Sequence, residues 1–380
     1  MAAPTTTFKS YAELPAVPEE RLVELRAQVI ALSQIIQPAQ RSKEWYDMRN
    51  GMITASDWGT ILGQNKYESR DSVLRKKIGM GTPFTGNIYT QWGQKYEAVA
   101  VQIYERRNGT HVQEFGLIQH PEYSFLGASP DGITADGVML EIKCPPKREI
   151  NGIIPSGYYC QIQAQLEVCK LDRCDFLECR IEEYARAEDY FEARAAAAAL
   201  DSSTPQLESG ALLCFYDTKE RLAKYDYLPI WVSREELESG IGARQAEIRA
   251  AHPTWLVATP AVTFWKLTQV SCVPVYRDQQ WFAEALPLLS DFWTEICEIR
   301  AGTRAPPAER PKRSLESDFD VNIPLPGVNI FSRKGKGGAG GAASITQELS
   351  ALSARDATET KPRGPVNPLA KGVNPFAKKR

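Results

Sequence analysis

The chain lacks two features that direct proteins to membranes. It has no apolar run of about eighteen residues, the length that spans a bilayer, and its N-terminus has no basic and apolar signal segment. Hydrophobic residues make up 43% and charged residues 24% of its 380 positions, as in ordinary globular proteins. The sequence therefore predicts a soluble, intracellular protein that can bury a sizeable core.

The chain also lacks the spacings of a zinc or iron–sulfur site. Its eight cysteines include no Cys-x-x-Cys pair, and its three histidines show no ligand spacing. A cysteine outside such a site behaves as a small apolar side chain. We therefore expect free thiols, either buried or on the surface.

Net charge is small, at −2, but it is unevenly distributed. Residues 301–380 contain about 14 basic and 7 acidic side chains, which leaves about 31 and 40 for the rest of the chain. From about Thr303 the sequence is rich in Pro, Gly, Ser and Lys, and such a segment buries too little apolar surface to order itself. Residues 303–380 are therefore predicted to form a disordered, basic tail.

A β-hairpin is predicted within residues 129–143. Apolar segments lie on both sides of a short turn that contains an Asp-Gly pair, which is a strong hairpin signal. Asp131 and Glu141 are then expected on neighbouring strands. Because side chains alternate along a strand, Glu141 and Lys143 share one face.

Two acids and a lysine in this arrangement suggest metal-assisted phosphodiester hydrolysis. Mg²⁺ prefers carboxylate and carbonyl oxygens and keeps waters that a substrate phosphate can replace. The amine of Lys143 would lie close to the attacking water or the scissile phosphate, while the cation activates water and stabilises phosphoryl charge. The same pattern also describes an ordinary exposed hairpin, and taken alone it does not decide between the two.

Residues 44–63 contain a candidate anion site. The pattern predicts a helix, a stop at Gly51, and a second helix that starts at Thr54 or Ser56, whose hydroxyls would cap it. Free amides at the helix start and the guanidinium of Arg49 would hold a phosphate. The alternative, a capped helix with a solvated Arg49, is favoured by these local features alone.

Two more helices are predicted on either side of the hairpin. In residues 92–104, Glu97 lies amid an apolar stripe, so it either points outward or reaches inward as a third acid with a metal, its water or a base as partner. In the helix after the hairpin, Gln161 and Gln165 lie one turn apart and share a face. With a strand at residues 173–181, these elements predict a mixed sheet flanked by helices.

The flanking segments are predicted to be mostly structural. Residues 18–36 are predicted to form an amphipathic helix, whose apolar stripe is Leu22, Leu25, Val29, Ile30 and Leu32. In an aromatic segment further on, the residues that recur at helical spacing are Trp281, Leu286, Leu289, Trp293 and Ile296. A core-packing helix explains this segment better than a base-stacking platform. The remaining predictions are a helix at 182–200, strands at 211–215 and 225–232, and a charged helix at 235–251.

Five motifs in order carry a resemblance to a known family. They are Trp45-x-x-x-Arg49-x-Gly51-x-Ile53-Thr54-Ala55-Ser56, Gly93 with Glu97, Ser129-Pro130-Asp131-Gly132, Glu141-Ile142-Lys143-Cys144-Pro145 and Tyr159-Cys160-Gln161-Ile162-Gln163. Over residues 40–185 the chain resembles the YqaJ-like viral recombinases, which are similar to lambda-type alkaline exonucleases of the PD-(D/E)XK nuclease superfamily. The resemblance implies a restriction-endonuclease-like α/β (α+β) core, with a mixed central sheet flanked by helices.

The resemblance also implies an activity and its site residues. The activity is that of a metal-dependent 5′→3′ exonuclease on linear double-stranded DNA, which exposes a 3′ single strand in viral DNA recombination and repair. Asp131, Glu141 and the carbonyl of Ile142 would bind Mg²⁺, with Mn²⁺ as the alternative, and Glu97 would support a metal-bound water. Lys143 would assist the nucleophile.

A pocket for the DNA 5′-phosphate is implied as well, formed by Arg49, Ser56, Ser129 and Gln161. This agrees with the anion site expected from Arg49 and the helix start at Ser56. Lambda-type enzymes form ring-shaped trimers, so a homotrimer is an implied assembly, although no motif here records an interface. A viral source would place the protein in the nucleus or cytoplasm of the host cell.

The tail contains two similar segments, at residues 366–371 and 373–378, each with an apolar anchor beside a lysine. They would dock onto a partner such as a single-strand annealing protein, or hold DNA by charge. Chance similarity in a low-complexity tail explains them equally well.

Other activities on the same fold remain open. Fold and metal site do not determine whether ends or internal bonds are cut, so a structure-selective or nicking endonuclease is the alternative. A non-catalytic DNA-binding scaffold is disfavoured because every expected catalytic position is filled. An iron–sulfur nuclease shares this fold, but the cysteine spacing argues against it.

The predicted domain organisation has four parts. They are an N-terminal helical segment (1–40), the PD-(D/E)XK nuclease core (41–185), a C-terminal extension packed on the core (186–302) and the tail (303–380).

Overall fold

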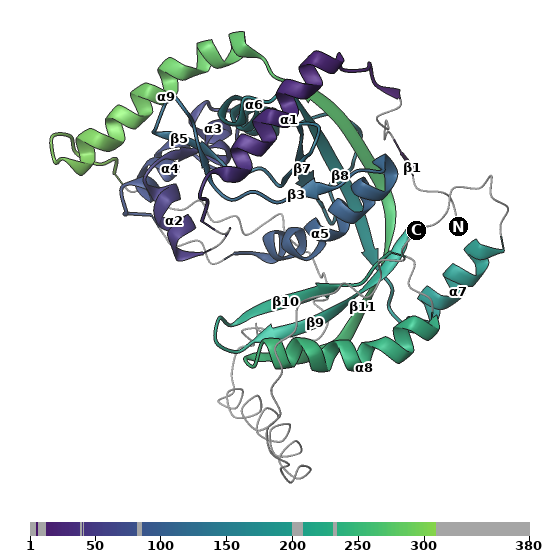
Figure 1. Cartoon of the computed structure of the whole chain (residues 1–380). Coiled ribbons are helices and arrows are strands. Elements are labelled where there is room, and N and C mark those ends of the chain that lie inside the picture. Colours follow the sequence, from purple (N-terminus) through teal and green to yellow (C-terminus); the bar gives the residue numbers. More distant parts are fainter. Residues whose placement is uncertain are drawn as a thin grey trace, which may run out of the picture. The chain divides into compact units, whose positions relative to one another are not determined.

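Figure 1 shows a computed structural model of the chain. The structure describes residues 5–6, 13–38, 40, 42–81, 86–199, 208–230 and 234–308. The predicted tail therefore lies outside the described residues except for its first few positions, and so do both of its similar segments.

A mixed eight-stranded sheet forms the centre of the described part. Its order is β10-β9-β11-β8-β7-β6-β3, and β1 pairs with β11 outside this path. The strands β7 and β8 run parallel, whereas β6 with β7 and β8 with β11 run antiparallel. The strands are β1 (Thr5–Thr6), β3 (Val112–Gln113), β6 (Gly132–Thr134), β7 (Val138–Lys143), β8 (Arg173–Glu183), β9 (Ser209–Asp217), β10 (Leu222–Tyr227) and β11 (Trp255–Tyr276).

A small second sheet, in the order β2-β5-β4, lies among the helices. Its strands are β2 (Ile53–Thr54), β4 (Ile118–Gln119) and β5 (Leu126–Ala128). Parallel pairing of β2 with β5 places the segment before Ser56 beside the segment before Ser129.

Helices cover both faces of the large sheet (Figure 1). They are α1 (Glu19–Gln34), α2 (Lys43–Asn50), α3 (Ala55–Ile61), α4 (Arg70–Lys77), α5 (Ile88–Asn108), α6 (Ser156–Cys169), α7 (Ala187–Ala198), α8 (Arg234–Ala251) and α9 (Gln279–Arg300). On one face α3, α6 and α9 bury Trp58, Leu166 and Phe292 in a common core. On the other face α5 buries Val99 against Leu140 of β7. The predicted class, a mixed α/β fold with a central sheet flanked by helices, is confirmed.

The alternation predicted for β7 is also confirmed. Met139 packs into the core on the α6 face, whereas Leu140 and Ile142 pack into the core on the α5 face. Glu141 and Lys143 therefore both point to the α6 face, where they contact each other.

Helices α3 and α6 approach each other so closely that their backbones are in contact. A Cβ atom on Gly59 of α3 would lie 3.0 Å from both the Cα and the carbonyl oxygen of Gly157 at the start of α6. Only glycine fits at such a contact without moving one helix away from the other.

The extension joins the core through the sheet. Strand β11 pairs with β8 along its second half and with β9 along its first half. Helix α9 confirms the prediction of a core-packing aromatic helix, because Trp281 stacks on Trp58 at 6.2 Å and Trp293 stacks on Phe125 at 5.9 Å. The most buried aromatic side chains of α9 are, however, those of Phe282 and Phe292.

Three local predictions were wrong. The helix expected from residue 182 starts at Ala187, because Glu183 still belongs to β8 and pairs with Trp265. The strand expected at 225–232 is β10, which ends at Tyr227. On α1, Ile30 was expected in the apolar stripe but is 58% exposed.

All eight cysteines are free, and only Cys297 is exposed, which agrees with the prediction of free thiols. Burial raises the pKa of the Cys160 thiol to about 11 and that of Cys169 to about 12, so these thiols stay protonated at neutral pH. Among the helices that the structure describes, none has both the length and the apolar character of a membrane span.

Candidate active site

The β6–β7 hairpin brings the first two candidate acids together. Asp131 precedes β6 directly, and pairing of Gly132 with Leu140 puts it at the level of Glu141. The backbone N–H of Ile142 donates to Oδ2 of Asp131 at 2.7 Å. This bond fixes the Asp131 carboxylate at the end of the hairpin rather than within a strand.

Glu141 is the buried centre of the site. Its side chain is fully buried, with one carboxylate oxygen paired to the ammonium of Lys143. The other oxygen, Oε2, accepts a hydrogen bond from Nε2 of Gln165 at 2.7 Å. The side chain of Lys143 is 26% exposed and lies 5.0 Å from the ring centre of Tyr158. Lys143 thus connects the buried acid to the surface.

Negative charge exceeds positive charge at this site. Burial, and next the charges of Glu141 and Glu97, raise the pKa of Asp131 well above its usual range, although Lys143 opposes this. Burial lowers the pKa of Lys143, but the charges of Glu141 and Asp131 outweigh it and leave that pKa above normal. Lys143 is therefore a cation at neutral pH, and it faces two acids, Glu141 and Asp131.

Asp131 and Glu97 both line a cavity of about 660 Å³ beside α5. Glu105 and Glu114 line it as well, and the described lining includes no lysine or arginine. Glu97 is half-buried and near enough to raise the pKa of Asp131, so it lies on the inner side of α5 rather than pointing out to solvent. An acidic cavity of this kind admits cations and water more readily than phosphates.

The hard oxygen donors present suit a divalent cation of the Mg²⁺ type. Among the described residues no three His, Cys, Asp or Glu side chains are arranged to hold a metal ion. Asp131 and Glu141 bring two carboxylates to one hairpin, and carboxylate oxygens are the ligands that Mg²⁺ prefers. The charge excess at Asp131 fits such an ion, provided that Lys143 releases Glu141.

Arg49, Ser56 and Ser129 are brought together around Trp45. Nη2 of Arg49 donates to Oγ of Ser56 at 3.0 Å, and its guanidinium lies 4.4 Å from the ring centre of Trp45. Nε1 of Trp45 donates to Oγ of Ser129 at 3.2 Å. The solvated Arg49 of the alternative interpretation is therefore not observed, because this side chain is held against an aromatic ring.

The start of α3 confirms the predicted cap at Thr54 and limits the predicted anion site. Thr54 is the N-cap residue, in a capping box with Asp57. Burial would raise the pKa of Asp57, but the charges of Lys77 and Arg49 keep it below normal, and Nζ of Lys77 lies 2.8 Å from its carboxylate. Because an acid already lies at this helix start, a phosphate grip would come from the Arg49 and serine side chains rather than from free amides.

Among the described residues, Gln165 makes contacts with the candidate site that the motifs did not predict. Within the part of the chain that the structure describes, no hydrogen bond joins Gln161 to Arg49, Ser56 or Ser129. Gln165, one turn further along α6, contacts Glu141 and lies 3.5 Å from the Ser129 carbonyl. The sequence placed Gln165 on the same helical face as Gln161. Spacing alone does not show which turn of α6 meets the sheet.

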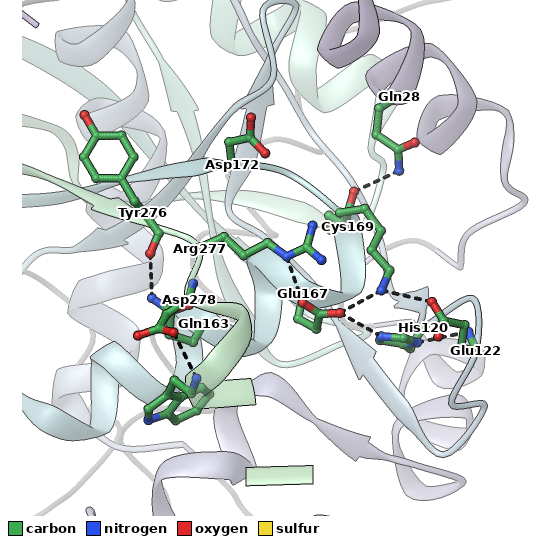
Figure 2. A network of polar contacts seen from close by, with 12 residues as sticks. Gln28, His120, Glu122, Gln163, Glu167, Cys169, Asp172, Tyr276, Arg277 and Asp278 are labelled. Carbon is green, nitrogen blue, oxygen red and sulfur yellow. Dashed lines mark hydrogen bonds and ion pairs between the residues drawn. The ribbon is translucent and has the colours of Figure 1, made fainter. Parts of the chain in front are cut away.

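The opposite face of α6 holds a second polar cluster, which Figure 2 shows. Nε2 of Gln163 donates to the Tyr276 carbonyl, and its Oε1 accepts from the Asp278 N–H, both at 2.8 Å. These bonds attach α6 to the junction between β11 and α9.

Glu167 lies at the centre of this second cluster. Its carboxylate is 2.7 Å from Nζ of Lys170, 2.8 Å from Nε of Arg277 and 3.6 Å from Nε2 of His120. Burial would raise the pKa of Glu167, but these partners lower it to about 2. No sequence motif pointed to Glu167 and its three partners, because they come from distant segments.

Comparison with known proteins identifies the region that holds these residues. Residues 44–172 match the YqaJ-like viral recombinase domain. Every candidate site residue lies within this matched region.

Two viral proteins are similar to the chain. An uncharacterized protein of Acanthamoeba polyphaga mimivirus is 34% identical over 314 residues, which cover 74% of this chain and 57% of that protein. A protein of African swine fever virus is 29% identical over 160 residues, or 34% of this chain and 46% of that protein. The chain thus spans about half the length of the curated relatives that it matches.

Solved structures with a loose likeness include two exonucleases. The alkaline exonuclease LHK-Exo from Laribacter hongkongensis has a TM-score of 0.40 and 20% identity, covering 69% of this chain and 96% of that one. A phage-related exonuclease from Haemophilus somnus has a TM-score of 0.38 and 12% identity, covering 67% and 96%.

Proposed function

We propose that this protein is a metal-dependent deoxyribonuclease that acts as a 5′→3′ exonuclease on linear double-stranded DNA in viral recombination and repair. The observation that carries the proposal is the convergence of Asp131, Glu141 and Lys143 at one hairpin, with Glu97 beside Asp131 in the same cavity. The YqaJ-like domain supports the role in recombination. The similar proteins of two viruses support a viral setting.

The acids would share the work of holding Mg²⁺, with Mn²⁺ as the alternative. Asp131, Glu141 and the Ile142 carbonyl would be its protein ligands, and Glu97 would reach it through a water. Such an ion supplies positive charge that activates water and stabilises charge on the phosphoryl oxygens.

Lys143 would contribute as a cation. Because its pKa is held above the normal value, it enters the reaction protonated and is no general base. Released from Glu141, its ammonium would orient the attacking water or neutralise the scissile phosphate. Its partial exposure beside Tyr158 leaves it free to make that move.

Arg49, Ser56, Ser129 and Gln161 would bind the terminal 5′-phosphate. The contacts of Arg49 with Ser56 and of Trp45 with Ser129 support a common pocket for the first three. Ser129 lies two residues before Asp131, so a phosphate held there is adjacent to the acids. Stepwise removal of nucleotides from a 5′ end needs this proximity.

The decisive experiment is digestion with Mg²⁺ of linear duplexes that are labelled at either end and carry a 5′-phosphate or a 5′-hydroxyl, with a closed circle in parallel. We expect stepwise loss from phosphorylated 5′ ends and an intact circle. The Glu141→Gln protein, purified in the same way, controls for contaminating nucleases.

Two other outcomes would contradict the proposal. Cutting of the circle would assign the protein to the nicking or structure-selective endonucleases. No cutting in Mg²⁺ or Mn²⁺ would leave a DNA-binding scaffold. The homotrimer and the single-strand annealing partner remain predictions, which sedimentation and binding assays on the full chain would test.

A further inference from the structure

Gln165 is a buried polar side chain that no site motif included. It lies on α6 with its whole side chain removed from solvent. Its Nε2 is 2.7 Å from Oε2 of Glu141 and 3.5 Å from the Ser129 carbonyl. It therefore touches both the central acid and the segment that leads to Asp131.

The chemistry of its neighbours fixes how the Gln165 amide is oriented. A carboxylate and a carbonyl only accept hydrogen bonds, so the amide nitrogen must face Glu141 and Ser129. The amide oxygen then points away, and it has no hydrogen-bond partner in the part of the chain that the structure describes.

An unpaired buried carbonyl is unfavourable for stability. An apolar side chain of the same length would fill this position without leaving an acceptor unpaired. What glutamine adds is the hydrogen bond that it donates to Glu141. This favours a role for Gln165 in the site over a role in packing.

The two donors to Glu141 differ in their freedom to move. Lys143 is partly exposed, so it can leave its carboxylate oxygen toward the surface. Gln165 is enclosed in the core between α6 and the sheet, so it keeps Oε2. The oxygen paired with Lys143 is therefore the one that is more readily available to a cation.

We propose that Gln165 is a positioning residue that restricts Glu141 to one-oxygen coordination of the catalytic cation. This inference rests on the proposed metal-dependent function. Mg²⁺ needs compact octahedral ligation and keeps its waters, whereas Ca²⁺ is larger and readily takes both oxygens of a carboxylate. By holding Oε2, Gln165 favours Mg²⁺ over Ca²⁺.

The test is calorimetric titration of the full-length protein with Mg²⁺ and with Ca²⁺ in the absence of DNA. Gln165→Met keeps the length of the side chain but removes the donor. Loss of a residue that orients a ligand weakens metal binding by about 10-fold or more, so we expect this for Mg²⁺. Ca²⁺ binding should fall less, since Glu141 can then offer both oxygens, and the affinity ratio shifts toward Ca²⁺.

Gln163→Met is the matched control, because Gln163 lies on the same helix but bonds to Tyr276 and Asp278. It should lower the melting temperature and leave both metal affinities as in the wild type. A merely structural role for Gln165 would make the two variants behave alike.

The outcomes separate this inference from the function beneath it. If the wild type binds Mg²⁺ and Gln165→Met binds Mg²⁺ and Ca²⁺ with the affinities of the wild type, the positioning role is wrong and the proposed function stands. If the wild type binds no divalent cation, the proposed function itself fails. Should Gln165→Met not fold, Gln165→Asn, whose amide is too short to reach Glu141, replaces it with the same expected result.

Discussion

Two carboxylates, Glu167 on α6 and Asp131 at the hairpin, have opposite surroundings. Glu167 has Lys170, Arg277 and His120 around it, and these partners lower its pKa to about 2. At the hairpin, the acids outnumber the one lysine, and the pKa of Asp131 is raised. Burial acts in the same direction on both groups, so the difference comes from the charges nearby.

The comparison separates the Glu167 cluster, whose charges are balanced, from the hairpin cluster of Asp131, Glu141 and Lys143, whose charges are not. Around Glu167 the positive groups balance the acid, so nothing further is needed for stability. At Asp131 and Glu141 the excess of negative charge is tolerated although it opposes folding. Such imbalance in a cavity is typical of sites selected for binding a cation or for catalysis.

The largest expected effect is a loss of cleavage when groups of the hairpin cluster are removed. Glu141→Gln and Lys143→Ala should each lower cleavage of linear duplex DNA by at least about 10³-fold, because a cation ligand or the charge beside the scissile phosphate is lost. Circular dichroism should show folded proteins. Asp136→Asn, in the turn of the same hairpin, is the control and should cleave normally; near-normal rates in the first two would refute the site.

Breaking the balanced cluster should reduce stability instead. Glu167→Gln leaves Arg277 and Lys170 without their buried partner, so we expect the free energy of unfolding to fall by about 3 kcal/mol. Denaturation by urea measures it. Glu122→Gln, which affects only an exposed partner of Lys170, should change it by less than about 1 kcal/mol. Equal losses would show that the Glu167 cluster is not special.

The same cluster predicts an acid limit. Because the pKa of Glu167 is depressed in the folded protein, its contribution is complete above the ordinary value of 4.5 and is lost as the pH falls toward about 2. Melting temperature measured across this range should fall more steeply for the wild type than for Glu167→Gln. Parallel curves would contradict the assignment.

Arg49→Ala should have a smaller and more selective effect. The ratio of rates on 5′-phosphorylated and 5′-hydroxyl ends should fall by about 10-fold, since one charge-assisted contact to the phosphate is removed. Rates on hydroxyl ends should change little. Arg186→Ala, at an exposed pair on the surface, should leave the ratio intact.

The smallest expected effect is a gain in thermal stability. The raised pKa of Asp131 means that its ionised form destabilises the fold as the pH rises above the ordinary value of 3.8. Asp131→Asn should therefore melt at a higher temperature than the wild type at neutral pH without metal, while losing cleavage. Differential scanning fluorimetry measures this, and a lower melting temperature would contradict the charge excess.

The features that could be predicted from the sequence are those set by neighbours along the chain. The alternation of Glu141 and Lys143 follows from the two-residue period of a strand, and the start of α3 follows from the cap at Thr54. Helix α9 follows from its regular apolar spacing.

What could not be predicted depends on contacts between distant segments. Glu183 continues β8 because it pairs with Trp265, more than eighty positions away, and this pairing overrides the local tendency to helix. The partners of Glu167 come from a loop, a helix end and the β11–α9 junction. The role of Gln165 depends on which turn of α6 meets β7.

The close contact of Gly59 with Gly157 has a mechanical consequence. Helix α3 carries Ser56, which belongs to the proposed phosphate pocket, and α6 carries Gln165, which holds Glu141. Since the two backbones touch, the distance between these two helices is fixed. Under the proposed function, a side chain added at position 59 would move Ser56 away from the acids and change the length of the fragment released at each step.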